Sequence, residues 1–211
     1  MFSIQMESKF ILTPSGKIHA QVAGVGDAIL LIHGYSPQFN SWRTWRKNID
    51  VLAQTYRVYA LDLLGYGESD KPARASDVEF QTNALIALLD AEKIEHVTLI
   101  GLSWGGAIAQ RIAARVPARV RKLVLVDSAT DSASLEVLRA HRLPTLITWD
   151  EEDVVIPVAR AHSLARELPH ARLRILTRAE RDPDANPENR HWSQETHSQV
   201  WNRIVMEFLK E

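Results

Sequence analysis

The sequence predicts an α/β fold in which a mostly parallel sheet is covered by helices on both faces. Short runs rich in Val, Ile and Leu alternate along the chain with stretches of helical periodicity. Several of these runs, such as Ala28–Ile32, are apolar at every position, as strands covered on both faces must be. No internal repeat, low-complexity segment or linker interrupts the alternation. We therefore expect residues 1–211 to form one domain.

Eight segments have the composition of strands, and Pro14-Ser15-Gly16 joins the first two through a turn typical of a hairpin. The expected strands are Lys9–Thr13, Lys17–Ala23, Ala28–Ile32, Tyr56–Leu61, His96–Ile100, Lys122–Val126, Thr145–Trp149 and, more weakly, Arg172–Leu176. The expected helices are Trp42–Gln54, Val78–Lys93, Gly105–Arg115, Ser134–Arg139, Val158–Glu167 and Ser198–Lys210. The polar segment between Leu176 and His191 contains two prolines, and this composition predicts a long loop.

The composition excludes several functional classes. The chain has no cysteine, so disulfides, thiolate zinc sites and a cysteine nucleophile are ruled out. Its 25 basic and 26 acidic residues leave a formal charge of −1, which disfavours a nucleic-acid partner. No segment is apolar enough for a membrane span, and the first residues lack the pattern of a secretory signal. We expect a cytoplasmic protein that acts on a small molecule without a metal or organic cofactor.

The strongest chemical signal is Gly101-Leu102-Ser103-Trp104-Gly105, which lies between a buried strand and an Ala-rich helix. A Gly-x-Ser-x-Gly motif in this position is typical of a nucleophile elbow, a turn so tight that the serine backbone is strained. Small residues on either side make room for the neighbouring chain, and the hydroxyl stands at the positive end of a helix. The pattern therefore predicts that Ser103 is a catalytic nucleophile.

Two further motifs extend this pattern. Leu31-Ile32-His33-Gly34-Tyr35 contains a His-Gly-X turn after the third expected strand, and Asp62–Asp70 reads D-x-x-G-x-G-x-S. Together with the Ser103 motif, and in the same order and spacing, they make the chain resemble the α/β-hydrolase family from end to end. The resemblance implies an eight-stranded sheet whose second strand is antiparallel, with a Ser-His-Asp triad at its edge.

A serine hydroxyl becomes a good nucleophile only when a base takes its proton and an acid orients that base. The resemblance implies His191 as the base, because the family places this residue between the last strand and the last helix. The following Trp192 also fits, although members usually carry glycine where this chain has Arg190. His33 belongs to the His-Gly-X turn, where the family uses it structurally. The other six histidines are expected at the surface or satisfied in the core.

The acid is expected in the segment Trp149–Pro157, which resembles the family's G-x-x-D-x-x-x-P turn. The match implies Asp153 as the catalytic acid. Asp150 replaces the glycine of that turn and is expected to be a solvated loop residue. Asp127, at the end of an earlier strand, is an alternative acid, because some relatives use that position. The chain order Ser, Asp, His is the one expected for this fold.

Acyl transfer also requires hydrogen-bond donors for the oxyanion of the tetrahedral intermediate. The backbone N–H of Trp104 directly follows the nucleophile, and the resemblance implies the backbone N–H of Tyr35 as the second donor. Aromatic side chains near the motifs are candidates for the substrate pocket. We single out Phe39 and Trp192, with Tyr35 and Trp104 beside them.

Relatives usually insert a cap of several dozen residues after the strand that ends at Asp127. Here the corresponding segment is about residues 128–143, enough for one short helix. The resulting open site disfavours epoxide hydrolysis, haloalkane dehalogenation and C–C bond hydrolysis, and the first two also use Asp in place of Ser103. The sequence thus predicts a serine carboxylesterase for small soluble esters. The alternatives are a lactonase or thioesterase, or a catalytically silent ligand receptor of the same fold.

Overall fold

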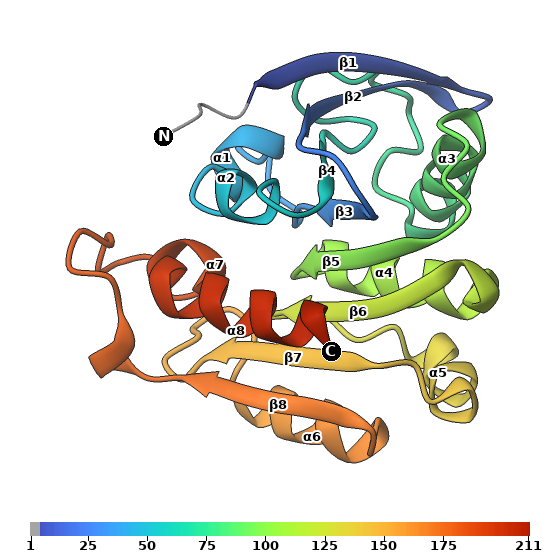
Figure 1. Ribbon diagram of the computed structural model, residues 1–211. Helices are drawn as coiled ribbons and strands as arrows, with labels where there is room; N and C mark the ends of the chain where they lie inside the picture. Colours follow the sequence, from blue (N-terminus) through green and yellow to red (C-terminus); the bar gives the residue numbers. More distant parts are fainter. Residues whose placement is uncertain (1–4) are drawn as a thin grey trace.

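A computed structural model describes residues 5–211 and shows one eight-stranded sheet (Figure 1). The strand order is β1-β2-β4-β3-β5-β6-β7-β8. β2 is antiparallel to both of its neighbours, and every other neighbouring pair is parallel. The predicted fold class and the antiparallel second strand are therefore confirmed. The strands are β1 (Met6–Thr13), β2 (Gly16–Ala23), β3 (Ala28–Ile32), β4 (Arg57–Leu61), β5 (Val97–Leu102), β6 (Val120–Val126), β7 (Thr145–Asp150) and β8 (Ala171–Leu176).

Helices pack on both faces of this sheet (Figure 1). One face is covered by α3 (Val78–Ala91), α4 (Trp104–Arg115), α5 (Leu135–His141) and α6 (Ala159–Glu167). The other is covered by α1 (Ser41–Trp45), α2 (Ile49–Leu52) and α8 (Ser198–Lys210), and the single turn α7 (Ser193–Thr196) leads into α8. Short 3₁₀ turns lie at Pro117–Arg119, Ser132–Ser134 and Arg178–Glu180.

The central strands divide their side chains between two hydrophobic cores. In β3, Leu30 and Ile32 belong to the core under α3 and α4, whereas Ile29 and Leu31 belong to the core under α1, α2 and α8. Successive side chains of a strand point to opposite faces, so a strand covered on both sides must be apolar at every position. This is why uninterrupted apolar runs predicted the sheet well.

The predicted helix Trp42–Gln54 is wrong as a single element. The chain instead forms α1 and α2, separated by a turn at residues 46–48. Asn48 in this turn is fully buried, and its side-chain amide donates to the carbonyl of Gln194 and the side chain of Asn202, each at 2.9 Å. These partners lie 146 and 154 residues away, so a buried polar anchor overrides the local helical periodicity.

The segment between β6 and β7 contains only the 3₁₀ turn Ser132–Ser134 and the two-turn helix α5. α5 packs on the α4 side of the sheet. Across residues 5–211, no helix has both the length and the apolar character that crossing a membrane requires.

Candidate active site

The carboxyl ends of four adjacent parallel strands bring the predicted site residues together. Ser103 follows β5, Asp127 follows β6, Asp153 follows the end of β7 by three residues, and His191 comes after β8. Ligands of open α/β sheets bind at this edge, because the loops that follow the strands converge there. The fold thus collects residues separated by 88 positions of sequence.

Ser103 has the backbone strain of a nucleophile elbow. Its φ of 53° and ψ of −121° lie where a residue with a side chain is rarely found. The turn is also sterically closed, because a Cβ on Gly101 would lie 2.4 Å from the carbonyl oxygen of Gly105. A Cβ on Gly105 would lie 2.4 Å from the carbonyl oxygens of Ile32 and His33. Both glycines of the motif are therefore required for β5 and α4 to meet at this angle.

His191 and Asp153 form a hydrogen-bonded pair. The Nδ1 of His191 lies 2.8 Å from one carboxylate oxygen of Asp153, and both side chains are largely buried. The other carboxylate oxygen accepts the backbone N–H groups of Val155 and Ile156 at 2.8 and 2.9 Å. An ionised carboxylate only accepts, so the bond assigns the hydrogen to Nδ1 and leaves the lone pair on Nε2. That Nε2 is buried and has no hydrogen-bond partner within residues 5–211.

Ser103 and His191 line the same pocket but are not hydrogen-bonded to each other in this conformation. Such bonds are often long in enzymes without substrate and shorten in the reactive complex. The arrangement supplies a strained hydroxyl, an imidazole whose free nitrogen can take a proton, and a buried carboxylate that fixes the tautomer. It can support nucleophilic acyl chemistry.

Asp127, the alternative acid, binds backbone rather than the imidazole. One of its carboxylate oxygens accepts the N–H of Asp150 at 2.9 Å, and the other accepts the N–H of Ser193 at 2.7 Å. Asp127 therefore ties the end of β7 to the residue two positions after His191. Burial raises the pKa of Asp127 to about 7; the nearby His191 lowers it, and the Asp153 carboxylate raises it further.

Asp150 is not the solvated loop residue that the sequence predicted. Its side chain is fully buried and lies 2.8 Å from the guanidinium of Arg181. A buried carboxylate needs such a partner, and here the partner comes from the polar loop after β8, 31 residues further along. Asp182, which follows Arg181, binds the start of α8. Its carboxylate accepts the backbone N–H of Ser198 at 2.9 Å and the hydroxyl of Ser198 at 2.5 Å. Arg181 and Asp182 therefore anchor the predicted loop to the end of β7 and to the start of α8.

The turn after β3 supplies the other side of the site. A Cβ on Gly34 would lie 3.1 Å from the Cβ of Ser103, so the backbone of this turn passes close to Ser103. The N–H groups of Tyr35 and Trp104 donate no hydrogen bond within residues 5–211, and both are free for a ligand. His33 holds the turn from behind, because its Nε2 accepts the N–H of Leu63 at 3.1 Å while its Nδ1 lies 2.8 Å from the carbonyl of Gly34.

The burial of His33 keeps its ring neutral. Burial lowers the pKa of His33 to about 4, although the hydrogen bond to Gly34 opposes this shift. A neutral ring with one donor and one acceptor nitrogen is what the two neighbouring backbone groups require. The side chain therefore has a structural role in the His-Gly-X turn.

A pocket of about 460 Å³ opens around Ser103 and His191. Of the predicted aromatic residues, Tyr35, Phe39 and Trp192 line it, and the rings of Phe39 and Trp192 lie 4.6 Å apart in an edge-to-face arrangement. Trp104 does not line this pocket; its ring packs on Tyr35 at 5.5 Å instead. The rest of the lining consists of Val154, Val155 and the polar residues that sequence reasoning missed: Ser36, Gln38, Arg43, Asn186, Glu188, Asn189 and Arg190. Only Arg190 carried a local signal, since it stands where the family usually has glycine.

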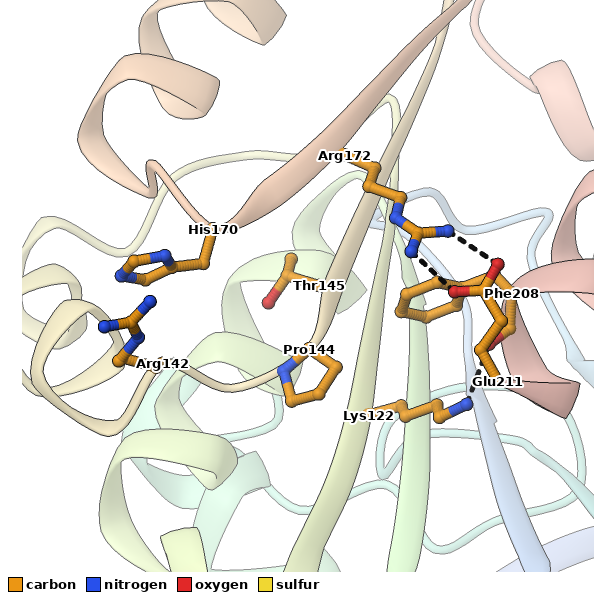
Figure 2. A pocket seen from close by; sticks show the side chains of 8 residues that line it. All are labelled: Lys122, Arg142, Pro144, Thr145, His170, Arg172, Phe208 and Glu211. Carbon is orange, nitrogen blue, oxygen red and sulfur yellow. Dashed lines mark hydrogen bonds and ion pairs between the residues drawn. The ribbon is translucent and has the colours of Figure 1, made fainter.

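A second pocket, of about 350 Å³, lies at the opposite ends of the strands (Figure 2). Lys122, Thr145 and Arg172 line it from near the starts of β6, β7 and β8, and Arg172 forms an ion pair with Glu211. It is therefore remote from Ser103. Within residues 5–211, no group of three His, Asp or Glu side chains is arranged to hold a metal ion.

A family profile described as alpha/beta hydrolase fold matches residues 27–141, more than half of the chain. The chain therefore belongs to the α/β-hydrolase family, as its motifs and sheet predicted.

The relatives include several proteins named as hydrolases of 2-hydroxy-substituted semialdehydes and oxo acids. The 2-hydroxymuconate semialdehyde hydrolase of Pseudomonas sp. (strain CF600) is 42% identical over 108 residues, which cover 51% of this chain and 38% of that protein. The first curated relatives are thus matched over less than half of their own length. A 2-hydroxy-6-oxononadienedioate/2-hydroxy-6-oxononatrienedioate hydrolase of Paraburkholderia xenovorans (strain LB400) is 25% identical over 284 positions, covering 96% of this chain and 95% of that protein.

The fold also matches solved structures along almost its entire length. The 2-hydroxy-6-oxo-6-phenylhexa-2,4-dienoate hydrolase from Rhodococcus sp. strain RHA1 superposes with a TM-score of 0.86 at 19% identity, covering 99% of this chain and 100% of that one. At this identity the likeness concerns the fold alone.

Proposed function

We propose that this α/β hydrolase is a serine carboxylesterase that cleaves small soluble esters. The observation that carries the proposal is the His191–Asp153 pair: His191 lines the same pocket as the strained Ser103, and its Nε2 has no partner within residues 5–211. A binding protein has no need of a nucleophile accompanied by an oriented base. The geometry therefore favours catalysis over the silent receptor of the same fold.

The proposed reaction has two half-reactions. The Nε2 of His191 takes the proton of the Ser103 hydroxyl while the Oγ attacks the ester carbonyl, and the N–H groups of Tyr35 and Trp104 stabilise the oxyanion. The tetrahedral intermediate then expels the alcohol, which receives the proton from His191, and an acyl-serine remains. Water repeats the sequence with the same base, releases the acid and restores Ser103. Asp153 stays ionised throughout and stabilises the imidazolium.

C–C bond hydrolysis is the second candidate, because relatives of this chain are named as hydrolases of 2-hydroxymuconate semialdehyde and of 2-hydroxy-6-oxo acids. These compounds contain no ester, so their hydrolysis breaks a C–C bond. The alignment with the Paraburkholderia relative extends over 284 positions, many more than the 211 residues here. Between β6 and β7, where the family inserts its cap, this chain has only a 3₁₀ turn and α5. A site that water reaches freely suits ester hydrolysis better than a reaction that depends on a closed cavity.

The test combines a covalent probe with a substrate panel. A fluorophosphonate is expected to add one label to the wild-type chain and none to Ser103→Ala. The panel contains p-nitrophenyl acetate, a γ-lactone, an acyl thioester and 2-hydroxymuconate semialdehyde. The proposal expects the highest kcat/KM for the oxygen ester. Labelling that persists in Ser103→Ala would show that Ser103 is not the nucleophile. Turnover of the semialdehyde alone would favour hydrolysis of a C–C bond.

A further inference from the structure

Two arginine side chains of the active-site pocket have no carboxylate partner. Arg43 in α1 and Arg190, directly before His191, both line the pocket that contains Ser103. Eleven other arginines form ion pairs with Asp or Glu in the described part of the chain. Neither pocket arginine has such a pair within residues 5–211. Their positive charges are therefore not neutralised by the fold.

Arg43 is held against the wall of the pocket. Its guanidinium carbon lies 6.0 Å from the ring centroid of Trp192, which packs in turn on Phe39. A guanidinium over an aromatic face is attracted by the ring and keeps its N–H groups available at its edge. Since Trp192 follows His191 in the chain, this charge is fixed beside the catalytic base.

Arg190 presents a buried donor without an acceptor. Its Nε is inaccessible to solvent and has no hydrogen-bond partner within residues 5–211. A buried N–H of a charged group that lacks an acceptor raises the free energy of the folded state. The side chain therefore gains free energy if it turns its N–H groups toward an acceptor in the pocket.

The remaining polar groups of the lining add donors rather than negative charge. Asn186 and Asn189 use their side-chain oxygens to accept the N–H groups of Glu188 and His191, which leaves their NH₂ groups as donors. Asp153 is engaged by His191. Glu188 is the one acidic residue among those that line the pocket, and it is exposed to solvent. The pocket therefore has an excess of positive charge and of hydrogen-bond donors.

We propose that the substrates of this site are esters that carry a second, ionised carboxylate, such as monoesters of short dicarboxylic acids. Arg43 and Arg190 bind that carboxylate, because a guanidinium offers paired donors that match its two oxygens. The aromatic rings of Phe39 and Trp192 cover the apolar part between the carboxylate and the scissile bond. This inference rests on the proposed esterase activity and names its substrate class.

The test compares esters of equal shape and different charge. Ethyl hydrogen succinate is paired with ethyl 4-methylpentanoate, in which two methyl groups replace the two carboxylate oxygens. A second pair, 4-acetoxybutyrate and 4-methylpentyl acetate, places the charge on the alcohol side instead. In the wild type we expect kcat/KM about tenfold higher for the anionic member of at least one pair, since each partly exposed contact contributes a few-fold. The ratio should decline between 0.05 and 0.5 M NaCl, because salt screens the attraction.

Variants separate a local effect from a general effect of charge. In Arg43→Gln/Arg190→Gln the anionic-to-neutral ratio is expected to fall to about one, whereas Arg43→Lys/Arg190→Lys retains part of it. The matched control Arg160→Gln/Arg203→Gln changes the net charge equally at two exposed arginines of α6 and α8, and should leave the ratio unchanged.

The outcomes distinguish this inference from the function on which it rests. Equal rates for both members of each pair in the wild type would overturn the substrate class while the esterase stands. An anionic-to-neutral ratio of kcat/KM that is unchanged in Arg43→Gln/Arg190→Gln would show that these two arginines do not cause it. Loss of all ester cleavage, neutral esters included, would overturn the proposed function itself and this inference with it.

Discussion

The proposed nucleophile and the proposed base of this site are held in place by different kinds of interaction. Ser103 is positioned by steric fit between backbones, with glycines at Gly101 and Gly105 that admit no Cβ. His191 lies at the end of a long polar loop, and buried carboxylates fix the surrounding chain. Asp127 binds the segment after His191, and Asp150 holds the loop through Arg181.

The difference indicates which substitutions the surroundings of Ser103 and of His191 each tolerate. Backbone fit is insensitive to charge, so the nucleophile side should fail through volume changes. The base side depends on buried charges whose removal leaves an unpaired partner in a site of low dielectric constant. The predictions below test this contrast, beginning with the largest expected effect.

Asp153→Asn is expected to reduce kcat by about 10⁴-fold, because the amide no longer fixes the His191 tautomer or stabilises the imidazolium. Asp127→Asn is expected to reduce it only about 10- to 100-fold, since Asp127 binds backbone N–H groups rather than the ring. The measurement is kcat for p-nitrophenyl acetate at saturating substrate. The reverse ranking of these two variants would assign the acid to the position after β6.

Arg181→Met should destabilise the fold by about 3–5 kcal/mol, because the buried carboxylate of Asp150 loses its ion-pair partner. The double variant Asp150→Asn/Arg181→Met removes both charges and should recover much of that free energy of unfolding. Urea denaturation of the three proteins measures the difference. Equal stability of the single and double variants would show that charge does not hold the base-side loop.

Acid should act on the turn after β3, beside the Ser103 elbow, through His33. Its pKa of about 4 in the folded chain lies below the value of 6.5 expected when unfolded, so the unfolded state binds more protons between these pH values. The contribution of the neutral His33 ring to the free energy of unfolding is therefore fully present above pH 6.5 and is lost as the pH falls through 4. It amounts to about 3 kcal/mol.

The measurement is the free energy of unfolding of wild type and His33→Gln between pH 7 and pH 4. The variant should be less stable at pH 7 but should lose less stability on acidification, while the titration of carboxylates affects both proteins alike. Parallel curves for the two proteins would contradict a neutral, buried His33.

The smallest of these effects concerns acyl-chain length. A buried CH₂ contributes about 0.8 kcal/mol, but only where a wall exists to cover it. Between β6 and β7 the chain offers only a 3₁₀ turn and α5 for such a wall. We therefore expect kcat/KM for p-nitrophenyl esters to be highest from acetyl to butyryl and to fall by octanoyl. A maximum at ten carbons or more would show that the loop before His191 closes over an apolar pocket.

The sequence predicted those parts of the molecule that depend on short-range patterns. The sheet follows from apolar runs, and the strained turn at Ser103 follows from glycines within two residues of it. The split between α1 and α2 and the buried state of Asp150 could not be predicted in this way. Asn48 and Asp150 find their partners 146 and 31 residues further along, and no local pattern encodes such contacts. Arg43 was missed as a pocket residue because it faces Trp192, about 150 residues further along.

The backbone conformation of Ser103 serves the proposed function but lowers the stability of the fold. A φ of 53° with a ψ of −121° is a conformation that glycine adopts without penalty, whereas a residue with a Cβ pays about 1–3 kcal/mol. Ser103→Gly should therefore abolish turnover yet raise the melting temperature by a few degrees. Differential scanning calorimetry of the two proteins measures this gain. Selection for a more heat-resistant chain would therefore be opposed at Ser103 by selection for the proposed activity.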